Sequence, residues 1–212
     1  MQTKPIDPQL HELFEKLNDD VVDLSWKWQV FRGLFRMQER IDLLNATAPS
    51  FFGLCQRTFA DDMFMMIGRL TDTPQTRGQD NLVITRLIDG VDQAQDPDFH
   101  RNLKTLTDAA FAACSSFKQH RHKRLAHNDL NARLQVTPNL LPSISFDQIN
   151  TAIEALQHVL NEFKGHYFDS ETSYKVFDSG GTKALVTFLE KGLVAFKAEE
   201  EQRLGSHGLT TS

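Results

Sequence analysis

The sequence predicts an all-α protein, an antiparallel bundle of about seven helices. Apolar residues recur at spacings of three and four along most of the chain, which is the period of an amphipathic helix. No run shows the sustained alternation of a strand flanked by hairpin turns. Sixteen Phe against two Tyr favour buried helix faces over an aromatic-lined binding surface.

The 212 residues suffice for one good hydrophobic core and are few for two. We therefore expect one domain at 1–205, followed by a flexible tail at 206–212. No stretch approaches the ~20 apolar residues that span a bilayer, and the N-terminus lacks the apolar core of a secretory signal. Cys55 and Cys114 lie in apolar helical patterns and are expected to be buried free thiols. We expect a soluble, cytoplasmic protein.

Four helices are predicted in the first half of the chain, from Pro8 to Leu17, from about Asp20 to 45, at 49–70 and at 81–91. One face of the second carries Leu24, Trp28, Phe31 and Phe35. The segment Ala48-Pro49-Ser50 ends the second helix and begins the third. The apolar residues of the third helix are Phe52, Phe59, Met63, Met66 and Leu70. Pro, Gly and polar residues predict a loop at 73–80.

Three further helices complete the bundle. The fifth starts with Asp96 as N-cap and Pro97 at the first helical position. Its apolar stripe has alternating spacings of four and three, typical of a helix packed lengthwise in a bundle. The stripe is Phe99, Leu103, Leu106, Ala110, Ala113 and Phe117.

After a loop at 131–143, Ser145 and Gln148 match a capping box at the start of the sixth helix. This helix repeats the stripe with Phe146, Ile149, Ile153, Leu156, Leu160 and Phe163. A polar loop through Gly180-Gly181 precedes the last helix, at about 182–203.

Beyond Phe117 the stripe of the fifth helix changes from apolar to basic. The next positions at the same spacing are His120, Arg124 and His127. A bundle cannot bury such groups without partners, so this end emerges into solvent, meets carboxylates or lines a polar cleft. Residues 101–124 hold six basic residues against one acidic residue, a local charge of +5 in a chain of net charge −5. Such a patch suits a phosphate-bearing ligand, and a solvated helix end is the alternative.

Arg121 and His127 offer the two groups that RNA cleavage requires. A His with the ordinary pKa of ~6.5 can take a proton from the 2′-hydroxyl, and an Arg can stabilise the charged transition state without a metal. At ~100° per residue the two lie about 120° apart on an ideal helix, so a second subunit could supply the facing pair. In the structural alternative, His127 caps the helix, and Arg121 or Arg124 pairs with Asp129 or the helix dipole.

The segment 121–129 (RHKRLAHND) resembles the signature of the HEPN superfamily, an Arg, a polar residue and, a few positions on, a His. A second stretch, 67–72 (IGRLTD) followed by Asn81-Leu82, is similar to the segment "RLxD…NL" of the AbiU-like branch, associated with phage abortive infection. The resemblance implies a HEPN-like helical core. It also implies a metal-independent endoribonuclease in phage defence, abortive infection or a toxin–antitoxin system.

The resemblance also implies roles for individual residues. Arg121 and His127 would be the catalytic pair, with His122 at a position where the family often has Asn. The residues expected to bind substrate or support the site are His120, His122, Lys123, Arg124, Asn128 and Asp129. Arg69 and Asp72 are expected to support the structure, and a surface ion pair between them is the alternative.

The same resemblance implies RNA as the substrate and a homodimer with two facing motifs. An antitoxin or a nucleotidyltransferase is a possible partner, whereas no metal, cofactor or membrane is expected. A catalytically silent HEPN-like module that binds RNA, a nucleotide or a protein partner is the alternative function. A di-iron bundle needs Glu-x-x-His on facing helices, but Glu154 and His158 are four residues apart.

Overall fold

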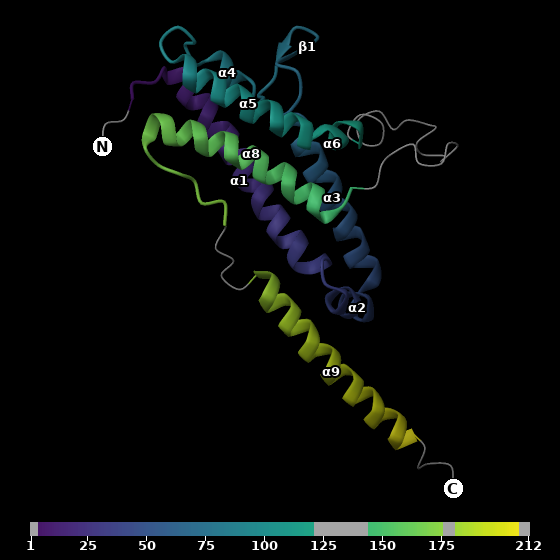
Figure 1. Ribbon diagram of the computed structural model, residues 1–212. Helices are drawn as coiled ribbons and strands as arrows, with labels where there is room; N and C mark the ends of the chain where they lie inside the picture. The colour runs from purple at the N-terminus through teal and green to yellow at the C-terminus, as the bar shows by residue number, and fades with distance from the viewer. Residues whose placement is uncertain (1–3, 121–143, 176–180, 208–212) are drawn as a thin grey trace. The chain divides into compact units, whose positions relative to one another are not determined.

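The structure is a computed structural model that describes residues 4–120, 144–175 and 181–207 (Figure 1). Its described residues form two compact units. One lies within residues 1–28 and 60–176, and the other within residues 29–59 and 177–212. The single domain at 1–205 and the flexible tail at 206–212 stay predictions.

Helices dominate the described chain and confirm the predicted all-α class. They are α1 (Pro8–Phe35), α2 (Gln38–Thr47), α3 (Pro49–Leu70), α4 (Arg86–Asp89), α5 (Pro97–Ala113), α6 (Ser115–His120), α8 (Phe146–Phe168) and α9 (Gly181–His207). The predicted loop at 73–80 holds a small antiparallel hairpin of β1 (Gln75–Thr76) and β2 (Gln79–Asp80). Between the strands, Arg77 and Gly78 have φ of 50° and 80°. Positive φ at both central residues is typical of a type I′ hairpin turn.

One continuous helix, α1, crosses the break that the sequence predicts between residues 17 and 20. The polar Asn18 lies inside this helix and is only 9% exposed. Its Oδ1 accepts hydrogen bonds from the hydroxyls of Tyr174 at 2.9 Å and Thr172 at 3.1 Å. Because a distant segment satisfies the buried amide, this residue does not end the helix. The predicted helix at 20–45 breaks instead at Arg36-Met37.

In the first unit, α1 packs antiparallel to α8. Near the start of α1, Phe14 stacks on Phe163 with ring centroids 5.1 Å apart. Near its end, the indole Nε1 of Trp28 donates a hydrogen bond to Oδ1 of Asn150 at 3.1 Å. The contacts run in opposite directions along the two helices, which is the predicted antiparallel arrangement.

The predicted caps of α5 and α8 are confirmed. Asp96 Oδ1 accepts a hydrogen bond from the backbone N–H of Phe99 at 3.2 Å, with Pro97 at the first helical position. At the start of α8, Ser145 Oγ accepts from the backbone N–H of Gln148, whose side chain accepts from the backbone N–H of Ser145. Both helices therefore begin where local hydrogen bonds satisfy their first N–H groups.

The buried stripe of α5 continues through a break at Cys114 into α6, and α5 packs along α8 (Figure 1). Its buried residues are Phe99, Leu103, Thr107, Ala110, Cys114, Phe117 and His120. Leu106 and Ala113, predicted in the stripe, are only half-buried. An α-helix of 3.6 residues per turn drifts from a strict heptad, which explains the shift by one residue to Thr107 and Cys114.

The second unit holds the end of α1, α2, the first part of α3 and α9. The α9 helix packs against α2. Gly33 of α1 allows close approach, since a Cβ there would lie 2.7 Å from Cγ2 of Thr182 in α9. Large apolar residues of α9 remain exposed, namely Leu185, Phe188, Val194, Phe196 and Leu204.

Both cysteines are free, but only one is buried. Cys114 is fully buried, whereas Cys55 is half-buried, so the prediction for Cys55 is wrong in part. Burial raises the pKa of Cys114 to about 12, which keeps this thiol protonated at neutral pH. Within the described residues, no helix is both long and apolar enough to cross a membrane.

Replacement of Asn18 by Ala is expected to lower the free energy of unfolding by about 1–3 kcal/mol, because the hydroxyls of Tyr174 and Thr172 both lose Asn18 Oδ1 as an acceptor. Urea denaturation of the variant and the wild type measures the difference. The control is Asn102→Ala, which removes an exposed hydrogen bond to Glu162 and should cost less than about 0.5 kcal/mol. Equal losses in the two variants would contradict the structural role of Asn18.

Candidate functional site

Most of the predicted catalytic segment lies outside the described residues: Arg121, His122, Lys123, Arg124, His127, Asn128 and Asp129. Their roles stay predictions. His120 is described and lies at the end of α6, where it is only 7% exposed. Its imidazole meets the ring of Phe64 on α3 edge-on, with centroids 5.6 Å apart. The last residue before the predicted motif is therefore held in the core against α3.

The positive charge predicted over residues 101–124 is partly offset on α5. Arg101 forms an ion pair with Asp98 at 3.0 Å, and Lys104 forms one with Asp108 at 2.6 Å. On α6, Nζ of Lys118 lies 4.1 Å from the centroid of the Phe111 ring. Two of the six basic residues in this range therefore have an acidic partner on α5.

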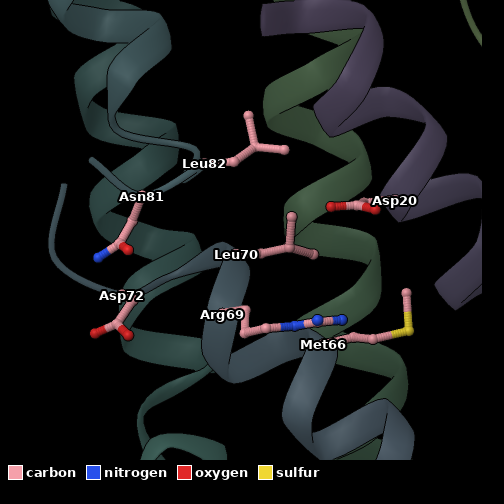
Figure 2. A pocket seen from close by; sticks show the side chains of 7 residues that line it. All are labelled: Asp20, Met66, Arg69, Leu70, Asp72, Asn81 and Leu82. Carbon is pink, nitrogen blue, oxygen red and sulfur yellow. The ribbon is translucent and has the colours of Figure 1, made fainter. Parts of the chain in front are cut away.

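A pocket of about 250 Å³ lies where the end of α3 meets α1 and the segment after the hairpin (Figure 2). It is lined by Asp20, Met66, Arg69, Leu70, Asp72, Asn81 and Leu82. The lining includes both halves of the second family-like stretch, Arg69 to Asp72 and Asn81-Leu82, although the hairpin separates them in the sequence. The residues predicted only as structural support thus border a cavity. Asp20 was not predicted from the sequence, because no local pattern pairs it with Arg69.

Hydrogen bonds around the hairpin fix Asn81 in the pocket wall. Its Nδ2 donates to the backbone oxygen of Thr73 and to the hydroxyl of Thr76, each at 2.8 Å. Arg86 donates from Nε to the backbone oxygen of Asn81 at 3.0 Å and from Nη2 to that of Pro74 at 2.7 Å. Both hydrogen bonds of the Asn81 amide nitrogen are therefore made within the loop.

Asp20 and Arg69 bring opposite charges to the same pocket. Burial raises the pKa of Asp20 above its ordinary value, and the nearby guanidinium of Arg69 offsets part of this rise. Neither side chain forms a hydrogen bond or a close ion pair with any residue that the structure describes, so Arg69 does not pair with Asp72. Figure 2 shows the Arg69 side chain extending toward the side of Asp20 and Met66, away from Asp72 and Asn81.

A second polar cluster joins the N-terminal segment to the start of α5 and the end of α8. Asp96 Oδ2 lies 3.2 Å from Lys4 Nζ and 3.1 Å from His166 Nε2. The imidazole of His166 stacks on Phe99 with ring centroids 3.5 Å apart. Burial lowers the pKa of His166, and the neighbouring Lys4 acts in the same direction. These contacts connect secondary-structure ends, which is a structural role.

No group of three His, Cys, Asp or Glu side chains within 4–120, 144–175 and 181–207 is placed to hold a metal ion. The polar groups that line the pocket are of different kinds: one guanidinium, two carboxylates and one amide. Such a lining suits an organic ligand that carries both hydrogen-bond donors and acceptors.

Comparison with known proteins gives one match. The model of a HEPN protein family described as AbiU2 matches residues 7–188, a range that takes in the motif at 121–129 and every residue of the pocket. This match confirms the resemblance drawn from the sequence. No curated protein and no solved structure matches the chain.

Replacement of Asp20 by Asn is expected to raise the free energy of unfolding at pH 7 by about a few tenths of a kcal/mol. The pKa of this carboxyl is higher in the folded chain than in the unfolded chain, so the ionised form destabilises the fold. The gain should therefore be present above the folded pKa and should vanish as the pH falls below the unfolded pKa, near 3.8.

Urea denaturation at pH 7 and at the lowest pH that keeps the fold measures this gain. The control is Glu12→Gln, which removes an exposed carboxylate elsewhere on α1. A loss of stability in Asp20→Asn, or an equal gain in both variants, would contradict a desolvated carboxylate at Asp20.

Proposed function

The chain belongs to the AbiU2 family of HEPN domains, and we propose that it is a metal-independent endoribonuclease of phage defence. Abortive infection and a toxin–antitoxin system are the two settings that fit such an enzyme. In this proposal His127 is the acid–base residue and Arg121 stabilises the phosphate. The family match carries the proposal, because it extends over the whole motif.

The chemistry needs only the two side chains and the RNA itself. His127 takes the proton of the 2′-hydroxyl, and the 2′-oxygen attacks the adjacent phosphorus. The bond from phosphorus to the 5′-oxygen breaks, and this oxygen leaves with the proton that the protonated His127 returns. Arg121 donates hydrogen bonds to the phosphate oxygens as their negative charge grows. The products are a 2′,3′-cyclic phosphate and a 5′-hydroxyl.

The burial of His120, the last described residue before the motif, supports this assignment. The buried stripe of α5 and α6 ends at His120, whose ring lies against Phe64. A buried last residue restrains where the following segment can begin. Buried as it is, His120 suits the supporting role better than direct contact with RNA.

A homodimer completes the proposed site. On one ideal helix Arg121 and His127 point about 120° apart, so two facing motifs can each contribute one member of a pair. Lys123, Arg124 and Asn128 would then hold the RNA backbone, with His122 and Asp129 in support. An antitoxin or a nucleotidyltransferase that covers the basic segment would keep the enzyme in check.

A catalytically silent binding module is the second candidate function. The pocket at Asp20 and Arg69 favours it, because donors and acceptors there are unused in the described structure. In that case RNA binding would survive His127→Ala and would fail when Arg121 and Arg124 are neutralised. A steep loss of affinity with salt would indicate phosphate contacts.

Incubation with total cellular RNA in EDTA is expected to show cleavage by the wild type. Arg121→Ala and His127→Ala should each reduce the initial rate by at least about 100-fold, the scale of a lost acid–base or phosphate-stabilising group. The rate is measured from the loss of full-length RNA on denaturing gels. Circular dichroism of each variant establishes that the helical fold is intact.

The matched controls are His11→Ala and Arg57→Ala, which remove exposed side chains of the same types on α1 and α3. Both are expected to cleave at the wild-type rate. Cleavage that persists in Arg121→Ala and His127→Ala would contradict the assignment of the active site. RNA left intact by the wild type, with binding retained, would favour the silent module.

A further inference from the structure

The pocket at the end of α3 holds hydrogen-bonding groups that the fold does not use. The carboxylate of Asp20 offers acceptors, and the guanidinium of Arg69 offers donors in a fixed planar fork. No residue of the described chain forms a hydrogen bond with either side chain. Asn81 differs, since the hairpin fixes its Nδ2 and leaves its Oδ1 as a further acceptor at the wall.

The size and the lining of the pocket favour a small, partly apolar ligand. Its volume of about 250 Å³ is below the ~300–1,000 Å³ of pockets that hold drug-sized molecules. Met66, Leu70 and Leu82 provide apolar surface between the polar groups (Figure 2). An unstacked nucleobase has this form, and bases of single-stranded RNA are held by stacking and by hydrogen bonds to their edges.

The arrangement of donors and acceptors distinguishes among the four bases. Guanine carries two adjacent donors, N1–H and N2–H, which match the two oxygens of one carboxylate, and two acceptors, O6 and N7, which match a guanidinium. In adenine and cytosine the amino group lies beside a ring nitrogen that would face the carboxylate with a lone pair. In uracil the single N–H lies between two carbonyls.

We propose that the side of the pocket formed by Asp20 and Arg69 binds a guanine base. Asp20 accepts from N1–H and N2–H, Arg69 donates to the acceptor edge, and the apolar side chains cover the face of the ring. This inference deepens the proposed function, on which it rests, because it names the base that the nuclease selects near its cleavage site.

The pocket lies on the same helix as the residue that His120 contacts. His120 contacts Phe64 of α3, and Arg69 follows Phe64 by five residues on that helix. At 1.5 Å and about 100° per residue, this places Arg69 about 7.5 Å farther along the helix axis and about 140° around it.

Binding of short 2′-O-methyl RNA tests the proposal, because these probes lack the attacking 2′-hydroxyl and cannot be cleaved. Five-residue probes with guanine, adenine, cytosine or uracil at the centre of a uracil run are titrated in EDTA by fluorescence anisotropy. The guanine probe is expected to bind at least about tenfold more tightly than the other three. Equal affinity for all four probes would overturn the proposal.

Free guanosine monophosphate is titrated separately to distinguish the source of the base. Binding of the guanine probe without measurable binding of the mononucleotide assigns the pocket to RNA. Comparable binding of both assigns it to a free guanine nucleotide as well. A guanine preference absent from both titrations overturns the guanine assignment.

Two variants and two matched controls test whether Asp20 and Arg69 cause the preference for guanine. Asp20→Asn and Arg69→Met are each expected to reduce the guanine preference by about tenfold, whereas Asp19→Asn and Arg57→Met, at exposed positions of the same helices, should retain it. Thermal unfolding of all four variants checks the fold. A guanine preference unchanged in both Asp20→Asn and Arg69→Met would overturn the proposal.

The outcomes for the nuclease and for the pocket are distinguishable. RNA cleavage that depends on His127 but shows no preference for guanine would leave the proposed function standing and overturn this inference. Guanine binding that depends on Asp20, in a chain that cleaves no RNA, would support this inference and contradict the nuclease.

Discussion

Burial of the stripe that runs from Phe99 to His120 holds the end of α6 against α3. Apolar side chains and Thr107 occupy this stripe until its last position, where the imidazole of His120 lies against Phe64. The core is close-packed, so a residue held there has little freedom to shift. The proposals for residues 121–129 depend on this starting point, because a catalytic pair is effective only when its two groups are held in position.

Polar groups inside the first unit fall into two classes. Asn18 is buried and its Oδ1 accepts from the hydroxyls of Tyr174 and Thr172, so it stabilises the fold. Asp20, only two residues later on α1, and Arg69 on α3 line a cavity without forming hydrogen bonds to the described chain. Arg69 is exposed and Asp20 is half-buried, so both side chains remain accessible to a ligand.

Local sequence signals predicted most of the helices. Where these predictions were wrong, long-range contacts explain the difference. The caps at Asp96 and Ser145 and the start of α3 at Pro49 depend on residues within one turn, so the sequence shows them directly. The continuous α1 depends on Tyr174, far along the chain, and no local pattern reveals it. The pocket likewise required α1, α3 and the post-hairpin segment to meet, although the sequence had already marked Arg69, Asp72 and Asn81-Leu82 as family-like.

The chemical identity of the RNA ends tests the central claim most directly, since it reports which oxygen attacks the phosphate. Cleavage in EDTA is expected to leave a 2′,3′-cyclic phosphate on one fragment and a 5′-hydroxyl on the other. A single 2′-deoxy substitution is expected to block cleavage at that bond. Fragments with a 3′-hydroxyl and a 5′-phosphate, or continued cleavage at the 2′-deoxy position, would contradict catalysis by His127 and Arg121 through the 2′-hydroxyl.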